Sequence, residues 1–179
     1  MSVEKAQSVI ARLTDALGPG IVGQSAVGDG LADQLAGRRF TSILEIGTLR
    51  GIGAAVLACF AESVISLDVH AHPERDAVLA ALPRDIRDRI APVVVPDNDA
   101  KVLLVGQLNF EFAFVDAGHT VGQVRIDYNI TRRCGEMLFH DYPNSGSGCN
   151  GVGLVLDAEG ERDGVVERCQ PFAWWRARQ

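Results

Sequence analysis

Acidic and imidazole side chains gather at two places in the sequence, each at the end of a short apolar run. In FEFAFVDAGH, Asp116 closes the run and His119 follows three residues later; in EMLFHDY, His140 and Asp141 are adjacent. Carboxylate oxygens are the ligands that hard divalent cations prefer, and imidazole binds softer ions. An imidazole with a pKa near ~6.5 can also accept a hydroxyl proton at neutral pH. These four residues therefore suit a metal site, a general base, or both.

Each of these residues is assigned an expected role. Asp116, His140 and Asp141 are the expected metal ligands, and His119 with Asp116 the expected catalytic residues. Structural alternatives stand beside these roles. Asp116 can instead cap the helix that follows it, and His119 can cap that helix or hydrogen-bond a nucleobase.

A glycine-rich turn lies in the segment SILEIGTLRGIGAAVLACFAESVISLDVH, residues 42–70. Gly47, Gly51 and Gly53 let the backbone approach a ligand closely and adopt dihedral angles that other residues avoid. Asp68 follows 21 residues after Gly47, where an acid at the end of the next strand can accept hydrogen bonds from both ribose hydroxyls. The order of strand, turn, helix and acid indicates a nucleoside site. The alternative is that the three glycines serve only packing.

The motif around this turn reads E-x-G-x-x-x-G-x-G, which differs from the G-x-G-x-x-G fingerprint of dinucleotide-binding proteins. Glu45 lies in an otherwise apolar strand, two residues before Gly47, and burying an acid there is costly unless it has a partner. The ammonium of a methionine-like group, reached directly or through water, is such a partner. The motif thus departs from the dinucleotide fingerprint and places an acid where it could accept a hydrogen bond from an ammonium group.

The elements that would position these residues follow from the changing period of apolar residues. Short runs rich in β-branched and aromatic residues predict strands at 42–46, 63–69, 91–95, 110–116 and 136–142. Helices are predicted between them at 52–61, 74–89, 98–108 and 120–132. This alternation predicts an α/β fold, a doubly wound, mostly parallel sheet with helices on both faces. Ligands of such sheets bind beyond the carboxyl ends of the strands, where both polar clusters and the glycine turn lie.

The remaining segments flank this core. The sequence predicts helices at 3–17 and 25–36, a Gly/Ser/Asn-rich loop at 143–151, a short helix at 152–159 and terminal strands within 164–178. We expect one domain over 1–179, with its parts at 1–37 (N-terminal helices), 42–142 (cofactor-binding core) and 143–179 (loop and terminal strands). The two tryptophans near the C-terminus are expected to serve the core or a dimer contact.

The overall composition argues against several classes of protein. The 179 residues are 47% hydrophobic and 22% charged, which is typical of a globular domain. A net charge of −6 argues against a nucleic-acid surface, and no apolar run approaches the ~20 residues that span a bilayer. The four cysteines form no CxxC pair, and the N-terminus lacks the apolar core of a signal peptide. We therefore expect a cytoplasmic protein with a small-molecule substrate and neither nucleic acid nor membrane as partner.

Motif I, from Glu45 to Gly53, followed by VDAGHT and HDY, resembles class I S-adenosylmethionine-dependent methyltransferases. Within that superfamily the spacing is similar to the small O-methyltransferases of the type-24 and catechol O-methyltransferase-like groups. The resemblance covers roughly residues 25–157. It implies a Rossmann-like class I fold and transfer of a methyl group from S-adenosylmethionine to a hydroxyl of a small molecule.

Carried over to this sequence, the resemblance assigns the cofactor contacts. The methionine end would contact five residues of motif I: Glu45, Gly47, Thr48, Gly51 and Gly53. Asp68 would hold the ribose, Asp97 and Asn98 are the candidates for adenine, and residues 26–30 would close over the cofactor. Leu49 departs from the pattern, because many class I enzymes have glycine at its position.

The resemblance also gives roles to the two polar clusters. The catechol-type enzymes hold magnesium with an acid after the fourth strand and two residues after the fifth, which correspond here to Asp116, His140 and Asp141. Because a histidine replaces an acid, a softer ion such as manganese or zinc suits the site better than magnesium. His119 matches the position of a general-base lysine. A homodimer, in which the partner subunit walls the acceptor pocket, is also expected.

Two other functions remain open on the sequence alone. The helix before the fifth strand is shorter than in the type-24 pattern and rich in β-branched residues, so the acceptor site could be reshaped or lost. The chain would then be a non-catalytic module that binds S-adenosylmethionine or another nucleoside. A nicotinamide-dependent oxidoreductase is disfavoured by the missing G-x-G-x-x-G fingerprint and by the lack of a Tyr-x-x-x-Lys pair.

Overall fold

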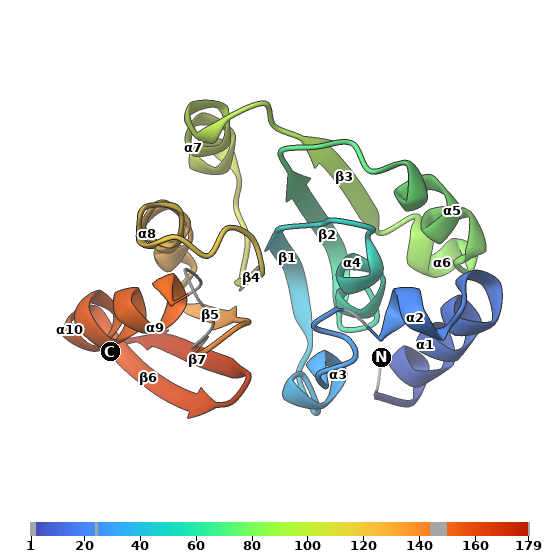
Figure 1. The fold of residues 1–179 in the computed structure, drawn as a ribbon, viewed down its shortest axis with the longest axis horizontal. Coiled ribbons are helices and arrows are strands. Elements are labelled where there is room, and N and C mark those ends of the chain that lie inside the picture. The colour runs from blue at the N-terminus through green and yellow to red at the C-terminus, as the bar shows by residue number, and fades with distance from the viewer. Residues whose placement is uncertain (1–2, 24, 144–149, 179) are drawn as a thin grey trace.

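The computed structural model describes residues 3–23, 25–143 and 150–178, and a seven-stranded sheet forms the centre of this part of the chain (Figure 1). The strands lie in the order β3-β2-β1-β4-β5-β7-β6. Their bounds are β1 Phe40–Ile46, β2 Ala61–Asp68, β3 Ile90–Val94, β4 Phe112–Val115, β5 Glu136–Phe139, β6 Gly164–Cys169 and β7 Phe172–Ala177. Strands β1 to β5 pair in parallel, whereas β7 is antiparallel to both β5 and β6. The predicted doubly wound, mostly parallel fold is confirmed.

Helices cover both faces of this sheet (Figure 1). One layer contains α1 Val3–Leu17, α2 Pro19–Val22, α3 Leu31–Gln34, α4 Ile52–Leu57, α5 Pro73–Ala81 and α6 Arg84–Arg87. The other contains α7 Asn98–Gln107, α8 Val121–Thr131, the 3-10 turn Arg132–Cys134, α9 Gly151–Val155, the π turn Leu156–Gly160 and α10 Glu161–Asp163. None of the described helices combines the length and the apolar composition that crossing a bilayer requires.

Alternate residues of the central strands point to opposite faces of the sheet and pack there in separate apolar cores, as the pleat of a sheet requires. In β4, Phe112 packs in the core beneath α1 to α6, and its neighbour Ala113 packs in the core beneath α8 and α9. The tryptophans of β7 divide in the same way. Trp174 lies 5.5 Å from the ring of Phe112, and Trp175 makes an edge contact with Tyr128 on the opposite face. Both tryptophans are at most 4% exposed, so they serve the core.

Two predicted helices differ from the structure. The helix expected over 25–36 is wrong for its first half, which forms turns, and only α3 is helical. A side chain at Gly28 would lie 2.7 Å from the carbonyl oxygen of Gly23, and Gly30 has φ +97°, so the two glycines fix a non-helical path. The helix expected over 74–89 divides into α5 and α6, because Leu82 adopts an extended conformation before Pro83. Most of the predicted loop, residues 144–149, lies outside the described residues.

Candidate functional site

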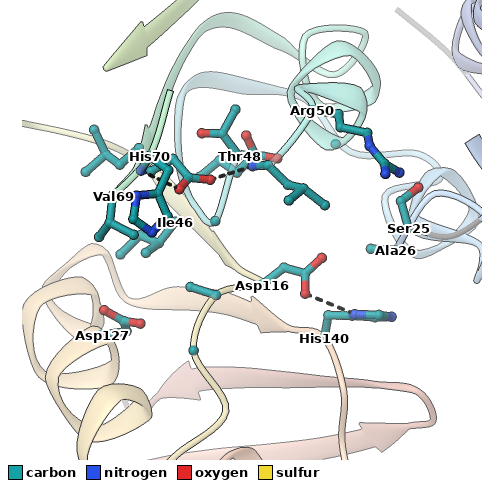
Figure 2. A pocket seen from close by; sticks show the side chains of 18 of the residues that line it. Ser25, Ala26, Ile46, Thr48, Arg50, Val69, His70, Asp116, Asp127 and His140 are labelled. Carbon is teal, nitrogen blue, oxygen red and sulfur yellow. Dashed lines mark hydrogen bonds and ion pairs between the residues drawn. The ribbon is translucent and has the colours of Figure 1, made fainter. Parts of the chain in front are cut away.

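A cavity of about 680 Å³ opens at the carboxyl ends of β1, β2, β4 and β5 (Figure 2). Its walls include the glycine turn after β1, the end of β2, the loop after β4, the end of β5 and part of the segment between α2 and α3. The structure therefore brings the predicted cofactor, catalytic and metal residues to one cavity, with two exceptions. Gly51 and Asp97 do not line it.

Gly47 and Gly51 have backbone conformations that only glycine adopts easily. Gly47 has φ +100°, and a Cβ atom there would overlap the carbonyl oxygen of Asp116. Gly51, with φ +83°, is the N-cap of α4, and a Cβ atom on it would face the side chain of Arg75. Gly47 thus exposes its backbone to the cavity, whereas Gly51 allows the turn to form but does not line the cavity.

Glu45 is buried and has its partners within the protein. The register of β1 and β2 places Glu45 beside Ser66, whose hydroxyl donates a hydrogen bond to the carboxylate. The Ser66 hydroxyl also lies 2.5 Å from that of Thr48. Burial raises the pKa of Glu45 to about 8, and the hydrogen bond from Ser66 offsets only part of this effect. Gly53 sits above Glu45, since a Cβ atom there would meet the carboxylate.

Main-chain donors hold the Asp68 carboxylate at the end of β2. Its Oδ2 accepts the N–H of Leu49 at 2.6 Å, and its Oδ1 accepts the N–H of His70 at 3.0 Å. Arg75 Nη2 lies 3.9 Å from the same carboxylate. Leu49, the departure from the family pattern, has φ +46°, which lies in the left-handed region that favours glycine. Asp68 therefore faces the cavity beside the glycine turn, where the predicted ribose contact requires it.

The two residues predicted for adenine separate in the structure. Asp97 is the N-cap of α7, and its Oδ1 accepts the N–H of Ala100 at 2.8 Å. Asn98, the next residue, lines the cavity. Asp97 thus has a helix-capping role that its position before a helical run could have indicated, and Asn98 alone keeps the predicted position.

An acid–imidazole cluster lies at the ends of β4 and β5. Potential ligand atoms of Asp116, His119 and Asp141 all lie within 4.8 Å of one another. His119 Nε2 is 2.7 Å from Asp141 Oδ2, and it is buried without a hydrogen bond of normal geometry to any described residue. Asp141 has φ +60°, so its backbone is in the left-handed region as well. The predicted base and the two predicted acidic ligands thus form one cluster.

His140, the third predicted ligand, is engaged differently. Its Nδ1 lies 3.1 Å from Asp116 Oδ1, and its Nε2 lies 2.9 Å from Asp29 Oδ2. Burial alone would lower the pKa of His140, but the hydrogen bonds and charges of Asp116 and Asp141 raise it to about 10. A protonated imidazole between carboxylates has no lone pair for a metal. The cluster of potential ligand atoms contains His119 and not His140, and the role of His140 as a metal ligand stays a prediction.

Comparison with known proteins adds to this geometry. No family model and no curated protein matches the sequence. Among solved structures, cofactor-bound Rv0187 from MTB superposes with a TM-score of 0.65 at 21% identity, covering 98% of this chain and 90% of that one. The O-methyltransferase TomG from Streptomyces achromogenes, in complex with SAM, gives 0.64 at 15% identity over 98% and 90%. The MycE methyltransferase of mycinamycin biosynthesis, with Mg and SAH, gives 0.56 at 12% identity over 94% and 54%.

The chain has the class I O-methyltransferase fold. The cavity of the present chain lies at the carboxyl edge of the sheet, where open α/β sheets bind their ligands. The resemblance of motif I, VDAGHT and HDY had implied the same fold, and the structure confirms that expectation.

The methyltransferase fold also brings residues to the cavity that the sequence did not single out. Asp29 reaches it from the turn before α3, and Arg50 from the glycine turn. Lys101 of α7 and Asp127 of α8 form a buried ion pair in its wall. A signal existed for Asp29, because it lies in the segment expected to close over the cofactor. Lys101 and Asp127 lie 26 residues apart, and no local pattern connects them.

Proposed function

We propose that the protein transfers a methyl group from S-adenosylmethionine to a hydroxyl of a small molecule. The main support for this proposal is that one cavity contains both a candidate cofactor-binding region and a candidate catalytic cluster. A glycine turn and the Asp68 carboxylate line one part, and the cluster of Asp116, His119 and Asp141 lines another. Solved structures of the same fold that hold SAM or SAH support the choice of cofactor.

The cavity residues suit the parts of this cofactor. Asp68 is fixed by the N–H groups of Leu49 and His70, and its remaining lone pairs would accept hydrogen bonds from the ribose hydroxyls. Val69, directly after β2, and Asn98, the first residue of α7 after β3, line the cavity and would contact the adenine. The bare backbone at Gly47 would let the methionine part pass close to the end of β1.

The donor set of Asp116, His119 and Asp141 fits a divalent cation. The buried Nε2 atom of His119 has no well-formed hydrogen bond to any described residue, which is expected of a nitrogen that binds a ligand. A set of one imidazole and two carboxylates suits manganese or zinc as well as magnesium. A cation bound there would lower the pKa of an acceptor hydroxyl and orient its oxygen. His140 would keep its place behind these ligands, hydrogen-bonded to Asp116.

Methyl transfer to oxygen requires that the acceptor hydroxyl loses its proton. The acceptor oxygen gains the methyl group, the departing sulfur keeps the electron pair of its broken bond, and the proton passes to a base. His119 is placed for this role, with Asp141 beside it to stabilise the imidazolium. Nε2 of His119 cannot be a metal ligand and the proton acceptor at once, so full activity after chelation of metal ions would favour the base.

The alternative of a non-catalytic cofactor-binding module fits the cluster less well. A module without an acceptor site would have no use for a half-buried imidazole whose buried Nε2 lies among the carboxylates of Asp116 and Asp141, because burying incompletely paired polar groups costs stability. The cytoplasmic location and the homodimer remain proposals from the sequence, and gel filtration with light scattering tests the second.

The proposal is tested by measuring S-adenosylhomocysteine formation from S-adenosylmethionine and a panel of catechols, sugars and phenolic polyketides. Each assay is run with EDTA, with Mg²⁺ and with Mn²⁺. The test variant is Asp141→Asn, because asparagine tolerates the left-handed backbone of that position. Its control is Asp88→Asn, an exposed acid at the end of α6.

We expect Asp141→Asn to lower turnover about 100-fold or more, since it removes a charge from the reacting centre, and to change affinity for S-adenosylhomocysteine by less than about threefold. Asp88→Asn should leave both unchanged. Loss of turnover in EDTA that Mg²⁺ or Mn²⁺ restores would show that the reaction needs a divalent cation, and full turnover in EDTA would exclude the ligand role and leave His119 as the base. Cofactor binding without turnover of any acceptor, or undiminished turnover by Asp141→Asn, would contradict the proposal.

A further inference from the structure

Arg50 lies in the glycine turn, one residue before Gly51, and lines the cavity. Figure 2 shows its side chain extending from the turn toward Ser25 and Ala26, at the end of the cavity opposite Asp127. The side chain is partly exposed, and no described residue forms an ion pair or a hydrogen bond with its guanidinium. Arg50 is thus a cation that faces the cavity without a partner in the described residues.

The other cationic side chains of the cavity wall have partners. Lys101 pairs with Asp127, and His140 lies between Asp29 and Asp116. Six acidic residues line the same cavity: Asp29, Glu45, Asp68, Asp116, Asp127 and Asp141. Burial raises the pKa of Glu45 to about 8 and Lys101 neutralises Asp127, so the negative charge of the wall comes from the other four. Such a wall attracts positively charged ligand groups and repels negatively charged ones. A ligand that carries one anionic group would therefore place that group at Arg50.

Other donors are scarce at this end of the cavity. The hydroxyl of Ser25 donates its hydrogen to the carbonyl oxygen of Val22 at 2.8 Å, so it is not free to donate to an anion. Gly53 has no side chain, because Glu45 fills the space that a Cβ atom would need. Among the described side chains at this end, Arg50 is the one whose N–H donors have no partner. The planar guanidinium can donate two parallel hydrogen bonds to a carboxylate.

We infer that Arg50 binds the α-carboxylate of the amino-acid part of the cofactor. This inference rests on the proposed function and adds a specificity residue to it. S-adenosylmethionine carries a sulfonium, an ammonium and a carboxylate. The first two groups suit the acidic wall, and the third needs a cation. Arg50 supplies that cation at the end of the cavity that lies away from Asp127. A carboxylate on the methyl acceptor is the other source of the same chemistry.

The test compares two ligands that differ only in this group: S-adenosylhomocysteine and its decarboxylated analogue. Their dissociation constants are measured by titration calorimetry on the full chain as wild type, Arg50→Gln and Arg50→Lys. Arg39→Gln is the matched control, because Arg39 precedes β1 at the opposite end of the strand and pairs with Glu62 at 3.1 Å on the surface. Circular dichroism confirms that each variant is folded.

We expect Arg50→Gln to weaken S-adenosylhomocysteine about tenfold or more, as loss of a charge-assisted contact does, and to change the decarboxylated analogue by less than about twofold. Arg50→Lys should restore part of the affinity, and Arg39→Gln should change neither ligand. An equal loss for both ligands, or an unchanged affinity for S-adenosylhomocysteine, overturns the inference; the second result would leave the acceptor as the source of the carboxylate. A wild-type protein that binds neither ligand would refute the proposed function and this inference with it.

Discussion

His140 Nδ1 lies 3.1 Å from Asp116 Oδ1, which joins the end of β5 to the end of β4 at the floor of the cavity. The other nitrogen of the same ring lies 2.9 Å from Asp29, in the turn before α3. One imidazole thus holds three separate segments of the chain around the cavity. Both nitrogens lie within hydrogen-bond distance of a carboxylate, and this arrangement holds Asp116 and Asp29 in place.

Replacing His140 is expected to destabilise the fold. His140→Ala would leave Asp116 and Asp29 without their shared cation and open a gap beside Phe172, whose ring centroid lies 5.0 Å away. We expect the free energy of unfolding in urea to fall by about 2 kcal/mol. His70→Ala is the control, because His70 is an exposed residue at the rim of the cavity. It should cost less than about 0.5 kcal/mol, and equal losses for the two variants would contradict the positioning role.

The buried pair of Lys101 and Asp127 gives a second prediction. Burial raises the pKa of Asp127, and the charge and hydrogen bond of Lys101 oppose that effect. Lys101→Met would leave a carboxylate inside the protein without a counterion, and we expect a loss of about 3 kcal/mol in the free energy of unfolding. Chemical denaturation of the ligand-free protein measures it.

A double variant separates this charge effect from simple packing. Lys101→Met combined with Asp127→Leu removes both buried charges, so it should recover most of the stability that Lys101→Met loses. If the double variant is as unstable as the single one, the cost lies in the lost volume and contacts of the lysine. The proposed desolvated charge would then be the wrong explanation.

Glu45 predicts a pH dependence of stability. Burial raises its pKa in the folded protein to about 8, above the ordinary 4.5 of the unfolded chain. Between these values the folded state holds a proton that the unfolded state releases, so this group lowers stability as pH rises through that window. Relative to Glu45→Gln, the wild type should lose up to about 1 kcal/mol for each pH unit between 5 and 8. Urea denaturation across this range measures the difference, and parallel profiles for the two proteins would show that Glu45 is not protonated in the fold.

Substitution of Gly47 and Gly106 by alanine should have opposite effects on stability, because their backbone conformations differ. Gly47→Ala would place a methyl group on the carbonyl oxygen of Asp116 at φ +100°, so we expect a loss of several kcal/mol or failure to fold. Gly106 lies in α7 with no atom within 4 Å of an added Cβ. Gly106→Ala should therefore raise stability by about 0.5 kcal/mol, because alanine favours the helix. Thermal unfolding of both variants tests the contrast, which fails if Gly47→Ala is tolerated.

Sequence patterns predicted the central strands well, because β4 and β5 are almost fully buried and read as short apolar runs. FAFV of β4 is buried at every position, and Glu45 stands out in β1 because the rest of that strand's second half is apolar. The same reasoning failed over residues 25–36. The apolar residues there have helical spacing, but they pack in turns, since Gly28 and Gly30 direct the chain elsewhere.

Site residues that lie at the ends of strands could be predicted from the sequence. Contacts between side chains that are far apart in the sequence could not. Asp68 and Asp116 lie at strand ends, so their approach to the cavity followed from topology. The surroundings of His140 depend on Asp29, which lies 111 residues earlier in the chain and whose carboxylate is 2.9 Å from one nitrogen of the ring. Sequence spacing carries no information on such a contact.

The central claim is that a nucleoside with an amino-acid arm lies across the end of β1, with its ribose on Asp68. The most direct measurement is titration calorimetry of the wild type with S-adenosylhomocysteine and, separately, with NAD, repeated with Asp68→Ala. We predict that S-adenosylhomocysteine binds to the wild type, that NAD does not, and that Asp68→Ala weakens the binding about 100-fold by removing the ribose acceptor. Binding of NAD alone, or undiminished binding of S-adenosylhomocysteine to Asp68→Ala, would contradict the account.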